Sequence, residues 1–344
     1  MVGLAGSRVL DTRIVRRAPP SGRQTRFVWP ERRAGVILVL LPELRQCRGN
    51  AARWPLGFDH QNSVTMSELA AKRDELLGNL RGLEGCAVAF SAGVDSAVVA
   101  KAAQLALGQR AVAVTAVSPS LAEGELDEAR RVAAEIGIRH LELATHEAAR
   151  AEYVANGPDR CYHCKRELYT ELGELCEKLD LGVVVNGVNA DDAFDYRPGL
   201  QAATEHRVRS PLLECGIDKA TVRQLAREWQ LSVAEKPAAP CLASRLAYGE
   251  EVLPERLEMI DRAEQWLRAE GFPVVRVRYH HGDLARIEVP LDDLERLLEA
   301  DRRQRVGERL REFGFRYITF DLEGFRSGSQ NELLPVEQLR AFRS

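Results

Sequence analysis

The stretch that decides the fold is Cys86-Ala87-Val88-Ala89-Phe90-Ser91-Ala92-Gly93-Val94-Asp95-Ser96. Residues 86–90 form a short apolar run typical of a buried strand, and a helical pattern continues over 94–107. Free N–H groups and the positive dipole end of a helix's first turn favour an anion. The pattern predicts a phosphate-binding loop made by Ser91, Gly93, Asp95 and Ser96. An ordinary capped turn between a strand and a helix is the alternative.

Outward from this loop, short apolar runs alternate with helical patterns. The expected strands are 86–90, 111–117, 140–144 and 183–186, and the expected helices include 94–107, 123–136 and one that follows Cys164. Strands of about five residues separated by helices imply parallel βαβ units. The sequence therefore predicts an α/β fold with a doubly wound parallel sheet.

The order of elements changes after Cys241. Residues 254–270 read as a helix, 274–279 and 284–289 as strands, 291–313 as one or two helices, and 316–321 as a last strand. This order predicts a small α+β domain after the sheet domain. We expect an ATP-binding domain over 66–248 and a substrate or assembly domain over 249–344.

The first 65 residues differ in composition from the rest of the chain. They hold eleven Arg, no Lys and four acidic residues, a formal charge of +7, so the remainder of this −3 chain carries −10. We interpret 1–65 as an irregular Arg-rich extension, either a targeting segment or the result of a start assigned upstream of Met66. The acidic remainder argues against a nucleic-acid partner.

The sequence has neither a membrane-spanning pattern nor a secretory signal, and both observations bear on where in the cell the protein is expected. No apolar run approaches the roughly 20 residues that a membrane-spanning helix requires. Seven cysteines, an odd number, with no secretory signal argue against a disulfide framework. We therefore expect a cytoplasmic protein with no membrane partner, in which Cys86 and Cys176 are buried structural thiols.

Three other cysteines form a pattern that suggests a reactive or metal-binding site. Cys161 and Cys164 make a CxxC, and Cys241 lies in the Pro-rich segment Pro237-Ala238-Ala239-Pro240-Cys241. This spacing is compatible with an iron–sulfur cluster, with a zinc site that includes His163, or with a redox pair. The residues alone leave these three possibilities open.

The phosphate loop resembles the SGGxDS signature of the PP-loop ATP pyrophosphatases, which cleave ATP between its α and β phosphates. It differs by having Ala92 where that family usually has Gly. From about residue 66 to residue 334 the chain also resembles the LarE family, ATP-dependent sulfur transferases of nickel-pincer nucleotide synthesis. The matching segments include Asn186-Gly187-Val188-Asn189-Ala190-Asp191-Asp192, Pro240-Cys241-Leu242-Ala243-Ser244-Arg245, Arg276-Val277-Arg278 and Asp321-Leu322-Glu323-Gly324-Phe325-Arg326.

The resemblance implies an ATP-dependent sulfurtransferase that adenylylates the carboxylate of a small pyridinium nucleotide and then forms a thiocarboxylate. It implies ATP and Mg²⁺, a symmetric homo-oligomer, and one of two sulfur sources. Either Cys161, Cys164 and Cys241 hold a [4Fe-4S] cluster, the better match here, or Cys241 surrenders its own sulfur. A PP-loop tRNA thiolase and a non-catalytic nucleotide or metal sensor remain the alternatives.

The resemblance also assigns roles to individual residues. It places Ser91, Gly93, Asp95, Ser96 and Asp192 at ATP, and Asp191 with Asp192 at Mg²⁺. Lys165, Ser244 and Arg245 join the three cysteines as catalytic residues, Lys165 by neutralising the activated phosphate. Arg276 and Arg278, together with Ser244 and Arg245, are expected to hold the substrate's phosphate and carboxylate, with Glu264 and Arg326 as further contacts.

Overall fold

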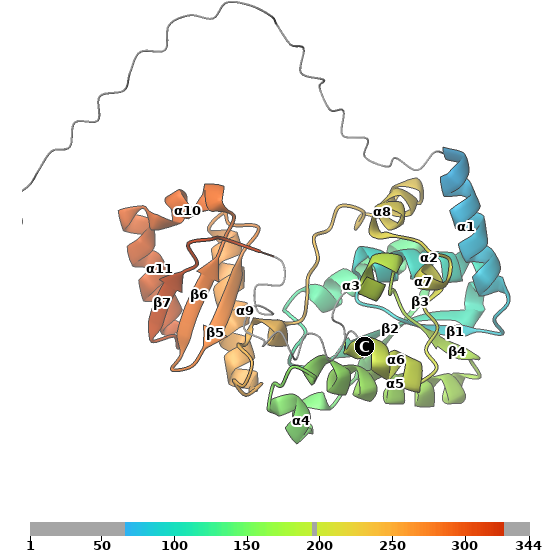
Figure 1. Cartoon of the computed structure of the whole chain (residues 1–344), viewed down its shortest axis with the longest axis horizontal. Coiled ribbons are helices and arrows are strands. Elements are labelled where there is room, and N and C mark those ends of the chain that lie inside the picture. The colour runs from blue at the N-terminus through green and yellow to red at the C-terminus, as the bar shows by residue number, and fades with distance from the viewer. Residues whose placement is uncertain (1–65, 195–197, 327–344) are drawn as a thin grey trace, which may run out of the picture. The chain divides into compact units, whose positions relative to one another are not determined.

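The computed structural model describes residues 66–194 and 198–326, and the predicted extension over 1–65 lies outside the described residues (Figure 1). Its first sheet contains β1 (Cys86–Ala89), β2 (Ala111–Val117), β3 (Arg139–Ala144) and β4 (Val183–Val185). The strand order is β3-β2-β1-β4, and all neighbouring pairs are parallel. The predicted doubly wound α/β fold is confirmed.

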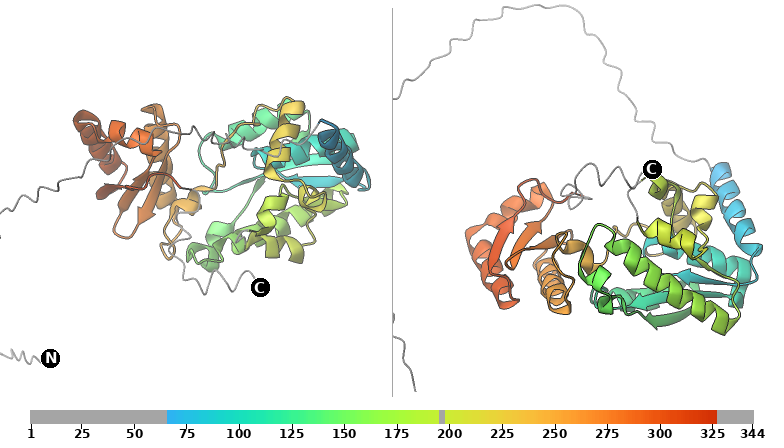
Figure 2. Two further views of the ribbon diagram at one scale, coloured as in Figure 1. Left: turned by 45° about the horizontal axis from the view of Figure 1, so that its top comes forward. Right: turned by 60° about the horizontal axis from the view of Figure 1, so that its bottom comes forward.

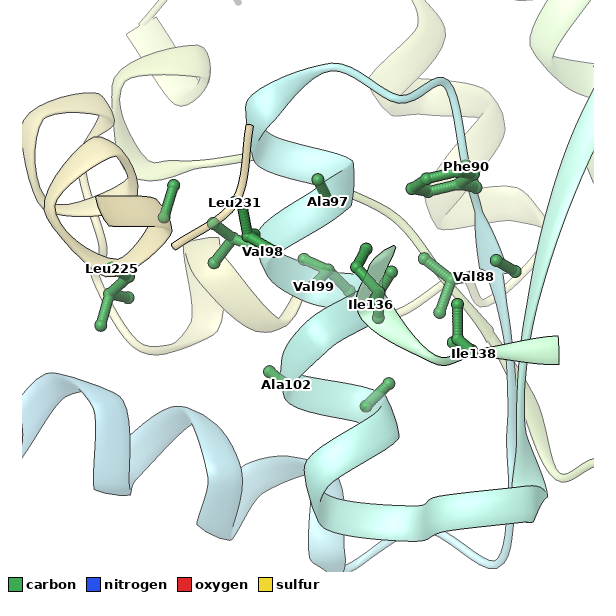
Figure 3. Close-up of a cluster of buried hydrophobic side chains, with 14 of the residues drawn as sticks. Val88, Phe90, Ala97, Val98, Val99, Ala102, Ile136, Ile138, Leu225 and Leu231 are labelled. Atoms are coloured by element: carbon green, nitrogen blue, oxygen red, sulfur yellow. The ribbon is translucent and has the colours of Figure 1, made fainter. Parts of the chain in front are cut away.

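Helices cover both faces of this sheet because alternate strand residues point to opposite sides (Figure 2). On one face, Val88 packs in a core with α1 (Met66–Arg81), α2 (Val94–Leu107), α3 (Glu125–Ile136) and α8 (Lys219–Glu228). Figure 3 shows part of this core, where Ala97 and Val98 of α2 lie near Leu231. On the other face, Ala87 packs with α5 (Arg160–Leu179) and α6 (Gly199–Glu205).

Helix α2 follows the phosphate loop and is buried on nearly all sides. Its small residues Ala97, Ala100 and Ala103 are fully buried, which lets the sheet and the neighbouring helices approach closely. Short elements complete this part: η1 (Gly108–Arg110), η2 (Glu147–Ala149), α4 (Ala151–Val154), η3 (Ala190–Phe194), α7 (Pro211–Glu214) and η4 (Leu242–Arg245).

The second sheet has the predicted α-β-β-α-β order. It follows α9 (Pro254–Ala269) and contains β5 (Arg276–His280), β6 (Leu284–Glu288) and β7 (Tyr317–Phe320), with α10 (Leu291–Leu298) and α11 (Ala300–Glu312) before β7. Strands β5 and β6 are antiparallel and β6 and β7 are parallel. The core of this part also includes Leu242 and Leu246, which follow Cys241. The proposed boundary at 248/249 stays a prediction.

Two predicted helix starts need correction. The helix placed after Cys164 begins at Arg160, so the CxxC lies within the first turns of α5. The helix expected from residue 123 begins at Glu125, because Gly124 adopts a left-handed conformation (φ 82°) at its N-cap. Across 66–194 and 198–326, no helix has the length and apolar character needed to cross a membrane.

Candidate active site

The phosphate loop joins β1 to α2 and is held by its own side chains. The Ser96 hydroxyl donates to the Gly93 carbonyl (3.0 Å) and accepts from the Ser91 N–H (3.3 Å). Gly93 is the N-cap of α2 and offers no side chain to the N–H groups of the first turn. These N–H groups therefore stay available for an anion.

Ala92 adopts the left-handed region (φ 53°) and is completely buried. This conformation disfavours any residue with a Cβ, which explains why related loops use glycine here. The loop keeps its shape in spite of Ala92 because its hydrogen bonds and buried position fix the backbone.

The Asp95 carboxylate is compensated by two residues that sequence reasoning missed. Its Oδ1 accepts from the Asn189 side-chain amide (3.0 Å), and its Oδ2 pairs with the Lys219 ammonium. Lys219 comes from the start of α8, and Asn189 from the segment after β4. A Cβ on Gly187 would lie 2.8 Å from the Ser96 nitrogen, so this segment can approach the loop only with glycine there.

Asp191 and Asp192, the two residues predicted to bind Mg²⁺, differ in burial and in their distance from the phosphate loop's cavity. Asp192 is buried, accepts from the Asn189 N–H (3.1 Å) and lines a cavity beside the phosphate loop. Asp191 is exposed, and its Oδ2 accepts from the Lys219 N–H (2.9 Å). The geometry brings Asp192, but not Asp191, to the cavity.

That cavity, of about 430 Å³, is the central feature of the site. Four predicted loop residues line it, and so do two of the three cysteines and Lys165. The lining includes Ser91, Gly93, Asp95, Ser96, Ser120, Glu147, Cys164, Lys165, Asp192 and Cys241. The structure thus joins the phosphate loop and the thiols, which are up to 150 residues apart in sequence, in one space.

The three thiols lie within electrostatic reach of one another. Cys161 and Cys241 are exposed and Cys164 is partly buried. Burial raises the pKa of Cys164 to about 12, with smaller contributions from the neighbouring Cys241 and Cys161 thiols. In the part of the chain that the structure describes, no three His, Cys, Asp or Glu side chains form a site for a single metal ion.

Two cations flank the thiols. Arg160, also missed from the sequence, is buried and donates to the Ala243 carbonyl (2.7 Å), and it lies 3.6 Å from the Cys161 sulfur. Burial acts to lower the pKa of Lys165, but the Tyr169 hydroxyl and the three thiols outweigh it and raise that pKa. Both cations therefore stay charged and favour negative charge on sulfur or on a bound phosphate.

Ser244 and Arg245 contact the backbone of Cys241 rather than the cavity. The Ser244 hydroxyl and the Arg245 guanidinium both donate to the Cys241 carbonyl, at 2.7 and 2.9 Å. Arg245 is held in turn by Glu264 through two hydrogen bonds of 3.0 and 3.1 Å. Glu264 is fully buried, so the geometry makes it a support for Arg245.

Further arginines surround Glu264, and we call Arg245, Arg268, Arg276 and Glu264 the arginine cluster. Arg268 donates to the second oxygen of Glu264 (2.6 Å). Burial, followed by the charge of Arg245, lowers the pKa of Arg276 to about 10. Arg245 and Arg268 bond to Glu264, whereas Arg276 donates to the Val275 and Ala238 carbonyls. Three guanidinium groups near one carboxylate leave a surplus of positive charge.

The remaining predicted substrate residues also form ion pairs. Arg278 is buried, pairs with Glu288 (2.8 Å) and donates to the Ser244 carbonyl (3.1 Å). Arg326 is partly buried and pairs with Asp321 and Glu323. Arg278 is thus connected to the Cys241 segment through Ser244, whereas the ion pairs of Arg326 are with acidic residues close to it in sequence.

Comparison with known proteins identifies one matching family model and several relatives of this chain. The asparagine synthase family model matches residues 79–171, which contain the phosphate loop and the CxxC. An uncharacterized protein of Synechocystis sp. is 45% identical over 266 residues, 77% of this chain and 99% of the relative. An uncharacterized protein of Methanocaldococcus jannaschii is 33% identical over 174 residues, 51% of this chain and 67% of the relative.

A third relative carries a functional name. The pyridinium-3,5-bisthiocarboxylic acid mononucleotide synthase of Lactiplantibacillus plantarum is 38% identical over 279 residues, 80% of this chain and 100% of the synthase. With the full length of that synthase covered at this identity, the chain belongs to the LarE family of PP-loop, ATP-dependent enzymes.

Proposed function

We propose that the chain converts a carboxylate of a pyridinium mononucleotide into a thiocarboxylate at the expense of ATP. The observation that carries this proposal is the cavity, in which the phosphate loop and Cys241 face the same space. The name of the Lactiplantibacillus relative describes a product with two thiocarboxylates, so two rounds of the reaction are needed per molecule.

In the first step, an oxygen of the substrate carboxylate attacks the α phosphorus of ATP. The bond from this phosphorus to the oxygen that bridges to the β phosphate breaks, and pyrophosphate leaves. The N–H groups at the start of α2 and the hydroxyl of Ser91 would hold the departing phosphates, and Ser96 would keep the loop in shape through its bonds to Gly93 and Ser91. Lys165 supplies positive charge on the thiol side of the cavity.

The proposed Mg²⁺ would neutralise the phosphates and improve the leaving group. Asp192 is the carboxylate best placed for this, since it lines the cavity beside the loop. Asp95 is a second candidate, provided that it exchanges Lys219 for the metal ion when ATP binds. Asp191 would act indirectly, by holding the backbone of Lys219.

In the second step, sulfur attacks the acyl carbon of the adenylate, a carbon–sulfur bond forms, and AMP leaves with the carbon–oxygen electron pair. If Cys241 is the source, its thiol proton passes to a base and a thioester results. Loss of the Cys241 α proton then breaks its carbon–sulfur bond, which leaves a thiocarboxylate and dehydroalanine. Ser244 and Arg245 would fix the Cys241 carbonyl during this step.

The alternative sulfur source is a [4Fe-4S] cluster on Cys161, Cys164 and Cys241. The donor set fits, because three thiols lie near one another and Arg160 and Lys165 offset the charge of thiolates. Each thiol would bind a different iron, so the three need not converge on one point. When bound, the cluster would supply a sulfide that is not part of the protein, and Cys241 would survive turnover.

The arginine cluster would bind the phosphate of the substrate through its surplus of positive charge. A guanidinium whose pKa is lowered by burial and by other arginines gains from a nearby anion, and Arg276 is such a group. Arg276 and Arg278 lie two residues apart on β5, and Arg278 contacts Ser244, close to Cys241. We therefore assign the substrate phosphate to Arg276, with Arg278 beside it and Arg326 as a more distant support.

The experiment is anaerobic purification of the full chain, followed by assay with ATP, Mg²⁺ and a 3,5-dicarboxylated pyridinium mononucleotide. Pyrophosphate, AMP and a thiocarboxylated product support the proposal, whereas ADP and phosphate overturn it. Iron and sulfide analysis with intact Cys241 after turnover indicates the cluster route. Iron-free protein in which Cys241 becomes dehydroalanine indicates the sacrificial route. Light scattering of the same sample tests the proposed homo-oligomer.

A further inference from the structure

One charged group of the cavity has no role in the mechanism above. Glu147 begins η2, directly after β3, and only 3% of its surface is exposed. It lines the cavity, and its Oε2 is buried with no hydrogen-bond partner among the residues that the structure describes. A buried carboxylate with an unpartnered oxygen is costly, so a bound ligand that interacts favourably with its charge would explain its presence.

The neighbouring groups that could neutralise Glu147 are engaged elsewhere. Arg150, three residues along the chain, pairs with Glu167. Arg160 donates to the Asn156 side chain and to the Ala243 carbonyl. The Tyr153 hydroxyl is hydrogen-bonded to the Ser120 hydroxyl. Lys165, which also lines the cavity on the thiol side, interacts with the three thiols and with Tyr169. The negative charge of Glu147 and the positive charge of Lys165 are both left for the contents of the cavity.

Glu147 lies on the thiol side of the cavity. Its charge contributes to raising the pKa of Cys164 and of Tyr153, both after the larger effect of burial. The acyl substrate must occupy this side for sulfur to reach its carbon, whereas the phosphates of ATP belong at the start of α2. A carboxylate repels phosphate and attracts a cation, and the ring of the proposed substrate carries a positive charge.

We propose that Glu147 recognises the positively charged aromatic ring of the substrate and selects it against an uncharged ring. This inference rests on the proposed function, which places a pyridinium beside the thiols. A ring nitrogen that carries a sugar has no N–H to donate, so its attraction to a carboxylate is electrostatic and needs no hydrogen bond. An oxygen without a hydrogen-bond partner, as in Glu147, suits this kind of ligand.

The test compares two ligands that differ only in charge. One is the 3,5-dicarboxylated pyridinium mononucleotide, and the other is its benzene C-riboside isostere, in which carbon replaces the ring nitrogen. Calorimetry measures the dissociation constant of each in the presence of a non-hydrolysable ATP analogue. We expect the wild-type chain to prefer the cation by roughly tenfold or more, and Glu147→Gln to remove most of this preference.

Three controls keep the result specific. Glu147→Asp keeps the charge and should retain part of the preference. Glu152→Gln removes an exposed acid of α4 and should change nothing. Affinity for the ATP analogue should stay within about twofold in all variants, which also verifies that the cavity is folded.

Each further outcome is decisive. An unchanged preference in Glu147→Gln overturns the inference, and so does a change in Mg²⁺ dependence without a change in ring preference, which would make Glu147 a metal ligand. Because binding is measured apart from turnover, failure of the wild-type chain to release pyrophosphate would count against the proposed function alone. A charge preference that depends on Glu147 would still support the inference.

Discussion

The arginine cluster and the cavity use charge in opposite ways. In the cluster, the Glu264 carboxylate is surrounded by guanidinium groups, and Arg245 in turn holds the Cys241 carbonyl. In the cavity, Glu147 has an oxygen without a partner, and Lys165 faces thiols and an aromatic ring. Charges that the protein satisfies, such as Glu264 with Arg245, fix the backbone. Charges left open, such as Arg276 at the edge of the cluster and Glu147 in the cavity, are available to ligands. Substitutions in the two regions should therefore affect different measurements.

The largest expected effect is on the cavity side. Cys241→Ala removes a thiol that both sulfur routes require, so formation of the thiocarboxylate should fall by roughly a thousandfold or more. Substrate-dependent release of pyrophosphate should continue for one turnover, because the phosphate loop is untouched. Mass spectrometry of the product, with pyrophosphate measured in parallel, checks this prediction. Cys215→Ala, which removes a buried thiol that does not line the cavity, is the matched control.

Substitution in the arginine cluster should lower the stability of the folded protein. Glu264→Gln leaves Arg245 and Arg268 with a neutral partner in a buried position, which should lower the free energy of unfolding by about 3 kcal/mol. Denaturant unfolding measures this loss. Glu258→Gln, which affects an exposed ion pair on the same helix, should lower it by less than about 1 kcal/mol. Equal effects of the two substitutions would contradict the structural role assigned to the buried Glu264.

A smaller effect is expected at Lys219. Without its ammonium, the Asp95 carboxylate faces the phosphates of ATP uncompensated, so Lys219→Met should raise KM for ATP by roughly tenfold. The KM for the carboxylated substrate should change little. Steady-state pyrophosphate release gives both constants, and Lys178→Met, in an exposed pair on α5, is the control. An unchanged KM for ATP would remove Lys219 from the nucleotide site.

The smallest effect concerns the pH dependence of stability. Folding raises the pKa of Cys164 from its usual 9.0 to about 12, so between these values the unfolded chain loses a proton that the folded chain keeps. Stability should therefore fall as pH rises from about 9 towards 12. Cys164→Ser should remove roughly 1 kcal/mol of this loss at about pH 10. Unfolding of both forms at about pH 8 and pH 10 tests the difference, which should be absent if Cys164 titrates normally.

The sequence was sufficient for elements whose pattern is local. The predicted helix over 94–107 and the predicted strand over 111–117 have the observed ends. The apolar run of the helix is bounded by Gly93 and Gly108, and the strand is a continuous apolar run apart from Thr115. The start of α5 was misplaced, since residues 160–165 are polar and aromatic and show no apolar periodicity. Their helical state depends on tertiary contacts, among them that of Arg160 with the Ala243 carbonyl.

Only those parts of the candidate site that carry a recognisable sequence motif could be predicted from the sequence. The phosphate loop and the cysteine pattern identified two walls of the cavity. Asn189, Lys219 and Glu147 were missed, because each reaches the cavity or the loop through the topology of the sheet and has no local signature. Glu264, expected at the substrate, is fully buried and bonded to Arg245, and its contact with the substrate stays a prediction. A pattern in sequence names a residue type, but pairing in the fold decides whether its charge is available.

The central claim is that activation by ATP and sulfur transfer take place in one cavity. The most direct measurement is a single turnover of the full chain, under anaerobic conditions, with ATP labelled at the α phosphate and the carboxylated pyridinium mononucleotide. The account predicts that labelled AMP and thiocarboxylate appear in equal amounts, and that Cys241→Ala stops at the acyl adenylate, with the label still on the substrate. Labelled ADP, or a thiocarboxylate that Cys241→Ala forms at the wild-type rate, would contradict it.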